Sequence, residues 1–140
     1  MLEKKRVLIV DDEVVIADSL AKVFSTNGFE SQVAYSVEGA VQTVSDWTPD
    51  LAIIDVCLKK VYGESLAILL KEKFPSCEIA LFTGQIALFA GSSYLSDLGE
   101  EAQDARHSFE VIFKPIHPKE ILRIAARKLA TLEDGEFRIA

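Results

Sequence analysis

The stretch Val7-Leu8-Ile9-Val10-Asp11-Asp12 leads four apolar residues into two aspartates, and Leu51-Ala52-Ile53-Ile54-Asp55 repeats this form with one aspartate. Short apolar runs of this kind are typical of strands that are buried on both faces of a parallel sheet. The strands of a parallel sheet all end at the same edge, where ligands bind. We therefore expect Asp11, Asp12 and Asp55 to form one acidic pocket.

Three clustered carboxylates repel one another. At about 4 Å and an effective dielectric constant near 20, each pair of charges costs about 4 kcal/mol before screening by salt. The cluster becomes tolerable if a divalent cation binds, if one carboxylate takes up a proton, or if solvent dissipates the charge. Of these three we expect the cation.

The composition indicates a single soluble domain. The chain has 140 residues and a net charge of −7, and this length supports a core without disulfides or metal staples. We expect one domain over residues 1–140, with its core at about 5–132 and a C-terminal tail at 133–140. The acidic balance argues against direct binding of nucleic acid.

The sequence also indicates the location of the protein and the redox state of its cysteines. The sequence has no apolar run of the roughly 18 residues that a membrane span needs, and residues 1–6 lack the form of a signal peptide. We therefore expect a cytoplasmic protein without membrane contact. Its two cysteines, Cys57 and Cys77, have no metal-ligand spacing and are expected to be reduced thiols.

Strand and helix patterns alternate along the chain. Apolar stripes predict helices that bury Val15, Ile16, Leu20, Val23 and Phe24 in the first case and Leu66, Leu69 and Leu70 in the third. The alternation predicts an α/β fold in which helices cover both faces of a five-stranded parallel sheet. The predicted strands are 6–10, 30–34, 50–54, 78–82 and 109–113, and the predicted helices are 14–27, 36–47, 64–73 and 118–132, with residues 85–108 the least legible.

Polar residues follow four of these strands. The acidic pair comes after the first, Asp55 after the third, Thr83 after the fourth, and Lys114-Pro115 after the fifth. In this order they resemble the receiver domain of two-component response regulators, the CheY-like family, over residues 5–132. The resemblance implies a flavodoxin-like, doubly wound sheet with strand order 2-1-3-4-5.

The resemblance also implies a magnesium site. Asp12, Asp55 and the backbone carbonyl of Cys57 would bind Mg²⁺ directly, and Asp11 would act mainly through water. Because Mg²⁺ prefers octahedral oxygen ligands and keeps several waters, a site with two carboxylates is chemically sensible. Cys57 could instead be a redox-sensitive thiol, although a loop residue that contributes only its carbonyl is the favoured reading.

Phosphoryl transfer is the chemistry implied by the same residues. Asp55 would be the phosphoacceptor, attacking the phosphohistidine of a histidine kinase or a histidine phosphotransfer protein. Thr83 would hydrogen-bond one phosphoryl oxygen, and Lys114 would neutralise another. The Lys114–Pro115 peptide bond would be cis, as in the family. Such a protein is a phosphoacceptor that catalyses its own phosphorylation and dephosphorylation, and it is not a turnover enzyme.

Three features depart from the family pattern. Lys59 stands where receivers usually carry proline, and Val111 stands where they carry a Tyr or Phe that rotates inward on phosphorylation. Thr83 and Lys114 are 114 − 83 = 31 positions apart, which is longer than usual. The extra residues fall in the fourth helix, part of the helix 4–strand 5–helix 5 face through which we expect a separate downstream protein, or a second copy in a homodimer, to bind a stand-alone receiver.

Other interpretations stay open at this point. Asp11 and Asp12 could cap the first helix, and Asp55 could be an ordinary turn residue. The chain could be an interaction module of receiver fold that no longer signals through phosphate. An aspartyl-phosphate phosphohydrolase would need an acid at position 57, where Cys57 stands. A flavin-binding protein of the same topology would need a phosphate-binding loop in place of the acidic residues 11–13.

Overall fold

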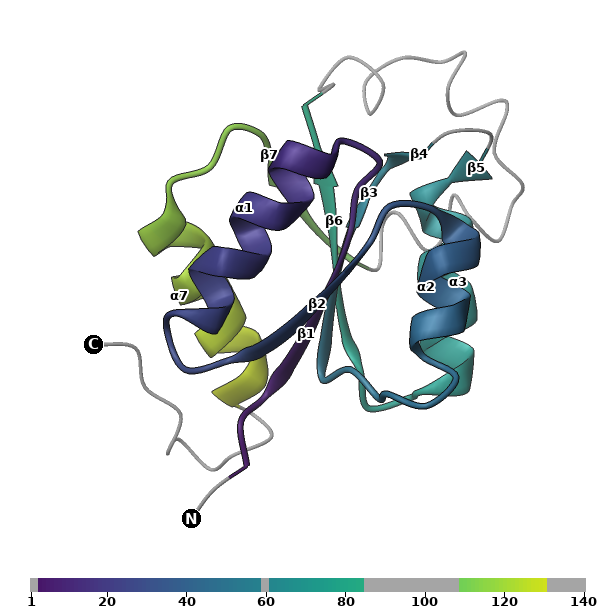
Figure 1. The fold of residues 1–140 in the computed structure, drawn as a ribbon, viewed down its shortest axis with the longest axis horizontal. Helices are drawn as coiled ribbons and strands as arrows, with labels where there is room; N and C mark the ends of the chain where they lie inside the picture. The colour runs from purple at the N-terminus through teal and green to yellow at the C-terminus, as the bar shows by residue number, and fades with distance from the viewer. Residues whose placement is uncertain (1–2, 59–60, 85–108, 131–140) are drawn as a thin grey trace.

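The fold is a five-stranded parallel sheet between two layers of helices (Figure 1). The computed structural model describes residues 3–58, 61–84 and 109–130. All four strand pairings in the sheet are parallel. Across the sheet, the strands are β2 (Glu30–Ala34), β1 (Arg6–Val10), β3 (Leu51–Asp55), β6 (Glu78–Thr83) and β7 (Glu110–Phe113). Counted along the chain this is the order 2-1-3-4-5, which confirms the predicted flavodoxin-like fold class.

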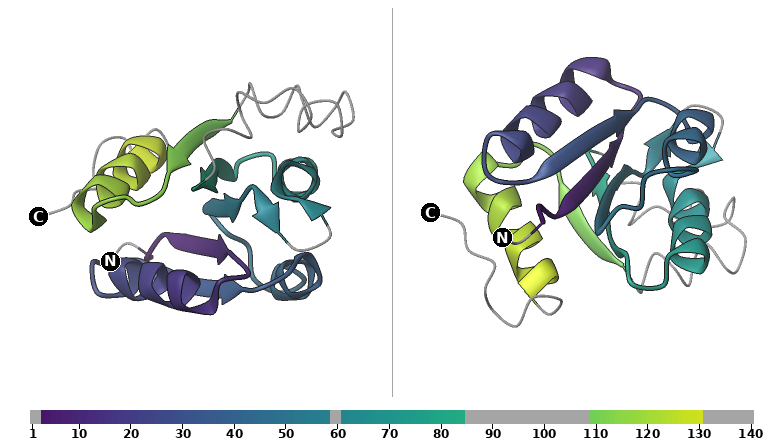
Figure 2. Two further views of the ribbon diagram at one scale, coloured as in Figure 1. Left: turned by 90° about the horizontal axis from the view of Figure 1, so that it is seen from above. Right: turned by 60° about the horizontal axis from the view of Figure 1, so that its bottom comes forward.

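In the described part of the chain, two helices cover each face of the sheet. On one side lie α1 (Val14–Ser25) and α7 (Pro118–Ala130), and on the other lie α2 (Val37–Thr43) and α3 (Gly63–Lys73) (Figures 1 and 2). None of these helices, and no other helix in the described part of the chain, has the length and apolar character needed to cross a membrane.

Each strand divides its side chains between two cores. Leu8 and Val10 pack in the core on the α2/α3 side, while Val7 and Ile9 pack in the core on the α1/α7 side. The other central strands alternate in the same way, because successive side chains of a strand point to opposite faces. Both faces of β1, β3 and β6 are apolar, so these strands lack the alternation of polar and apolar residues seen in half-exposed sheets, whereas the edge strand β2 exposes Glu30 and Gln32.

Local sequence sets the ends of the elements. After α1, the side chains of Thr26 and Asn27 donate hydrogen bonds of 2.7 Å to the carbonyls of Lys22 and Val23. Gly28 then adopts a φ of 94°, the left-handed conformation expected of it at a helix C-terminus. The hydroxyl of Ser36 accepts a hydrogen bond of 3.0 Å from the N–H of Gly39, as predicted for the residue that caps α2.

Several predicted helix details are wrong. Helix α1 ends at Ser25, two residues early, because Thr26 and Asn27 turn to its last carbonyls. Helix α2 ends at Thr43, and the predicted end, Trp47, lies in the following loop with its side chain buried. Val15 is 77% exposed and Leu69 is 45% exposed. The predicted stripes were too wide, since the buried faces run through Ala17, Leu20 and Phe24 on α1 and through Leu66, Ala67 and Leu70 on α3.

A small hairpin that the sequence did not predict follows Asp55. Strands β4 (Cys57–Leu58) and β5 (Val61–Tyr62) pair antiparallel before the chain turns into α3 at Gly63. The N–H of Gly63 donates a 2.8 Å hydrogen bond to the carbonyl of Val56, so helix and strand approach closely there. Lys59 and the segment 85–108 lie outside the described residues.

Gly63 is required by this close approach. A Cβ atom at position 63 would overlap the carbonyl oxygen of Asp55 and lie 2.9 Å from its carbonyl carbon. Gly63→Ala must therefore displace the end of β3, and we expect it to lower the free energy of unfolding by about 1–3 kcal/mol. Gly84→Ala is the control, since its Cβ would meet only side-chain atoms of Lys114 at 3.7 Å. Urea denaturation checks both, and equal stability of the two variants would contradict the prediction.

Candidate functional site

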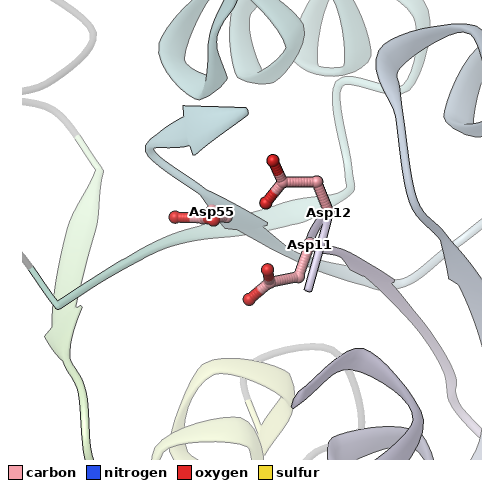
Figure 3. A group of neighbouring side chains, drawn as sticks. All are labelled: Asp11, Asp12 and Asp55. Carbon is pink, nitrogen blue, oxygen red and sulfur yellow. The ribbon is translucent and has the colours of Figure 1, made fainter. Parts of the chain in front are cut away.

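The carboxylates and the lysine singled out in the sequence meet at the carboxyl edge of the sheet. Asp11 and Asp12 follow β1, Asp55 ends β3, and Lys114 follows β7. One side-chain oxygen from each aspartate lies within 4.8 Å of the others. Figure 3 shows the three carboxylates extending from the ends of two neighbouring strands toward a common space. The predicted acidic pocket is therefore present.

Asp11 is a buried carboxylate with both oxygens engaged. One oxygen accepts a 2.8 Å hydrogen bond from the ammonium group of Lys114, and the other accepts a 2.9 Å bond from the N–H of Glu13. Its own N–H donates to the carbonyl of Ala34 at 3.1 Å. These bonds fix Asp11 at the base of the cluster. Asp11 therefore pairs with Lys114 and also accepts a hydrogen bond from the N-terminal end of α1.

Asp55 is also buried, and its charge is only partly compensated. Its Oδ1 accepts a 3.2 Å hydrogen bond from the N–H of Cys57, and its Oδ2 lies 3.6 Å from the ammonium nitrogen of Lys114. Burial and then the negative charge of Asp11 raise the pKa of Asp55 to about 7, although the charge of Lys114 acts in the opposite direction. In the metal-free protein this group takes up a proton far more readily than an ordinary aspartate.

Lys114 bridges the two buried carboxylates. The ammonium nitrogen of Lys114 lies 5.0 Å from the centroid of the Phe82 ring. The backbone N–H of Lys114 donates a 2.7 Å hydrogen bond to the carbonyl of Thr83. Burial lowers the pKa of Lys114, but the hydrogen bond to Asp11 and the charges of Asp55 and Asp11 outweigh it, so the pKa is raised overall. The Lys114–Pro115 bond is cis, as the resemblance implied.

These groups open onto a pocket of about 330 Å³. Thr83, at the end of β6, is 1% exposed and lines it together with the half-buried Cys57. Among the described residues, the lining consists of Asp12, Glu13, Asp55, Cys57, Thr83, Gly84 and Lys114. The sequence analysis did not assign Glu13 and Gly84 to the site. The one feature of the sequence that could have indicated them is that each directly follows a predicted site residue, Asp12 and Thr83 respectively.

Cys57 is an unreactive thiol in this setting. Burial, and then the charge of Asp55, raise its pKa above the ordinary value, and burial raises the pKa of Cys77 to about 12. Because the thiolate is the reactive species, both side chains stay protonated at neutral pH. Cys57 begins the short strand β4 and is not in a loop, and its backbone N–H contacts the acidic cluster through the hydrogen bond to Asp55.

The donor set suits a hard divalent cation. Three carboxylates offer oxygen ligands within reach of one another, and oxygen ligands are the ones that Mg²⁺ binds. The raised pKa of Asp55, caused first by burial and then by the charge of Asp11, agrees with a cluster whose negative charge is incompletely compensated. Asp12, Asp55 and the Cys57 backbone would hold the ion.

Comparison with known proteins identifies the same family. The profile of the response regulator receiver domain matches residues 7–126. The chain is 23% identical over 128 residues to the nitrogen assimilation regulatory protein NtrX of Azorhizobium caulinodans, covering 90% of this chain and 26% of that protein. It is 35% identical over 81 residues to the heme response regulator HssR of Staphylococcus saprophyticus, covering 58% of this chain and 36% of that one.

Solved structures support the fold. A CheY-like response regulator receiver domain from Methanospirillum hungatei superposes with a TM-score of 0.77 at 23% identity, covering 94% of this chain and 98% of that chain. By contrast, the chain spans about a quarter to a half of the length of the first curated relatives it matches.

Proposed function

The chain belongs to the response regulator receiver domain family, and we propose that it accepts a phosphoryl group on Asp55 in a Mg²⁺-dependent reaction. One observation carries this proposal. Asp11, Asp12 and Asp55 converge within 4.8 Å, with Lys114 held between two of them. The helix-cap and turn interpretations of these aspartates do not account for a lysine drawn into the same pocket from the last strand.

In this proposal the metal site consists of Asp12, Asp55 and the backbone carbonyl of Cys57, with Asp11 acting through water. When bound, Mg²⁺ supplies positive charge that offsets the carboxylates and the incoming phosphoryl oxygens. Asp11 keeps Lys114 aimed at the pocket through their 2.8 Å hydrogen bond. An aspartate that already shares its oxygens with Lys114 and Glu13 is a poorer direct ligand than Asp12.

A carboxylate oxygen of Asp55 attacks the phosphorus of a phosphohistidine. The new O–P bond forms as the N–P bond breaks, and the electron pair of the N–P bond returns to the imidazole of the donor. Thr83 donates a hydrogen bond to one phosphoryl oxygen, and the ammonium of Lys114 stabilises the charge on another. The protein itself needs no proton transfer for this step, because Asp55 enters as the carboxylate.

The donor in this proposal is a histidine kinase or a histidine phosphotransfer protein. The output is a changed affinity for a separate protein at the face that includes β7 and α7, with a homodimer as another use of that face. We place the protein in the cytoplasm, as one domain with its core at residues 5–132, and without direct contact to nucleic acid. It is a phosphoacceptor and not a turnover enzyme.

Labelling with a small phosphodonor tests this function. Incubation with acetyl phosphate and Mg²⁺ should add one phosphoryl group per chain by intact mass, and hydroxylamine should remove it, as it does for acyl phosphates. A chelator should prevent labelling. Absence of label with acetyl phosphate and phosphoramidate, together with absence of Mg²⁺ binding, would favour the alternative of an interaction module. Hydrolysis of many phosphoesters per chain would instead indicate a phosphohydrolase.

The affinity for Mg²⁺ should depend on pH through Asp55. Its pKa of about 7 means that below pH 7 the ion must displace a proton, so the apparent affinity should fall about tenfold per pH unit as the pH decreases. Above pH 7 the affinity should level off. Calorimetric titration at pH 5.5, 6.5 and 8 measures this dependence, and Asp55→Asn should remove most of it. An affinity that is flat from pH 5.5 to 8 would contradict the prediction.

A further inference from the structure

Among the charged residues that the structure describes around the Asp55 pocket, Glu13 is the exposed one. It follows Asp12 in the chain and lines the same pocket. Of the other charged residues in this lining, Asp12 and Lys114 are half-buried and Asp55 is buried. A phosphodonor that approaches from solvent therefore meets the carboxylate of Glu13 at the entrance of the pocket.

The fold uses the backbone of Glu13 and leaves its side chain available. The N–H of Glu13 donates a 2.9 Å hydrogen bond to Asp11, and its carbonyl accepts a 3.0 Å bond from the N–H of Ala17. A residue directly before a helix often caps it with a side-chain oxygen. The carboxylate of Glu13 makes no such bond to the described first turn of α1, so it is free to interact with an incoming molecule.

The charge of Glu13 also acts inside the pocket. Burial lowers the pKa of Lys114, whereas its hydrogen bond to Asp11 raises it. The charges of Asp55, Asp11 and Glu13 raise the same pKa further. Glu13 thus adds negative charge to a pocket where three carboxylates already converge. Because a phosphoryl group is itself anionic, this charge disfavours a donor that brings no positive charge of its own.

Phosphodonors differ in the charge of the group that leaves. A protonated phosphohistidine ring is cationic and leaves as neutral imidazole. As the O–P bond to Asp55 forms, the electron pair of the N–P bond returns to the ring nitrogen, and the proton on the other ring nitrogen stays in place. Acetyl phosphate leaves as acetate, so negative charge develops on the leaving oxygen. A carboxylate near the leaving group favours the first reaction and disfavours the second.

We propose that Glu13 determines the class of phosphodonor, favouring donors with positive charge on the leaving nitrogen over donors that leave as an oxyanion. This inference rests on the proposed function and names the substrate class of the same pocket. A phosphohistidine with a protonated ring belongs to the favoured class. Small acyl phosphates belong to the disfavoured class, and Glu13 slows their reaction with Asp55.

Two small donors test this proposal, because phosphoramidate is protonated on its nitrogen near neutral pH and acetyl phosphate has an oxygen leaving group. Intact mass spectrometry gives the second-order rate constant of labelling by each donor at saturating Mg²⁺. The ratio of the phosphoramidate rate constant to the acetyl phosphate rate constant should fall about three- to tenfold in Glu13→Gln, the effect of one partly screened charge pair. A changed Mg²⁺ affinity would act on both donors and cancel in this ratio.

Glu38→Gln is the matched control. Glu38 is also exposed and lies in the first turn of a helix, α2, but it is outside the described lining of the pocket. This variant removes the same charge from the chain and should leave the ratio unchanged. In about 0.5 M salt, where the screening length is about 4 Å, the difference between parent and Glu13→Gln should shrink. A difference independent of salt would indicate a packing effect and overturn the inference.

The outcomes distinguish this inference from the proposed function. If both donors label the parent protein and Glu13→Gln keeps the parental ratio or raises it, the inference is wrong and the proposed function stands. If Glu38→Gln lowers the ratio as much as Glu13→Gln, the net charge of the chain sets the ratio and the inference is again wrong. If neither donor labels the parent protein, both are wrong.

Discussion

Asp55→Asn is expected to abolish phosphoryl incorporation from acetyl phosphate, with a loss of at least about a hundredfold in rate. The amide that replaces the carboxylate has no nucleophilic oxygen of comparable strength. Asp11 cannot take over, because it is buried and both of its oxygens accept hydrogen bonds. Intact mass spectrometry at fixed times measures the effect, and persistent labelling of the variant at the parental rate would exclude Asp55 as the phosphoacceptor.

The same variant should be at least as stable as the parent without metal. The pKa of Asp55 is raised in the folded protein to about 7, compared with about 4 in the unfolded chain. Ionisation of Asp55 therefore lowers the free energy of unfolding as the pH rises from about 4 through about 7. Removing the charge at pH 8 should therefore stabilise the metal-free protein by about 1–2 kcal/mol, after a discount for solvent screening. Asp50→Asn, at the opposite end of the sheet where Asp50 accepts from the N–H of Arg6, is the control and should label normally.

Lys114→Gln is expected to show opposite effects on chemistry and on metal binding. Losing the ammonium group removes charge stabilisation of the transferring phosphoryl group, which should slow labelling by about 10²–10³-fold. It also leaves Asp11 and Asp55 without the cation that lies 2.8 and 3.6 Å from them. The affinity for Mg²⁺ should therefore rise, by several-fold in a calorimetric titration at pH 8.

Lys128→Gln provides the matched control for this pair of measurements. Lys128 and Lys114 have equally buried side chains, and each pairs with two acidic residues, which for Lys128 are Glu78 and Glu110, away from the pocket. Lys128→Gln should leave labelling and Mg²⁺ affinity unchanged. If Lys114→Gln weakened Mg²⁺ binding instead, Lys114 would be supporting the shape of the site and not competing with the ion.

The sequence predicted the sheet well because the information lies in short apolar runs. Strands β1 and β2 were predicted to the residue, and β3, β6 and β7 within one residue. Helix faces were less well predicted. Val15 and Leu69 belong to apolar stripes by sequence, but each stripe is wider than the sheet can cover, and sequence alone does not say which edge stays exposed.

The sequence predicted which residues form the site and the edge of the sheet at which they lie. It did not predict which side chains pair with one another inside the site. Strand ends brought Asp11, Asp12, Asp55, Thr83 and Lys114 to one pocket. The side-chain hydrogen bond from Lys114 to Asp11 depends on the strand alternation that turns both side chains toward the α1/α7 side. The β4–β5 hairpin was missed because its strands have two residues each, too few to show a period.

The bond between Lys114 and Asp11 joins positions that are 103 residues apart. A ribosome that has made all three aspartates must still add 114 − 55 = 59 residues, more than it has already joined, to reach the lysine. Until then, Asp11, Asp12 and Asp55 repel one another in a nascent chain that does not yet contain Lys114. Under the proposed function, a chain can accept a phosphoryl group efficiently only once Lys114 has been added, and an unfinished chain should not draw phosphoryl groups away from the finished protein.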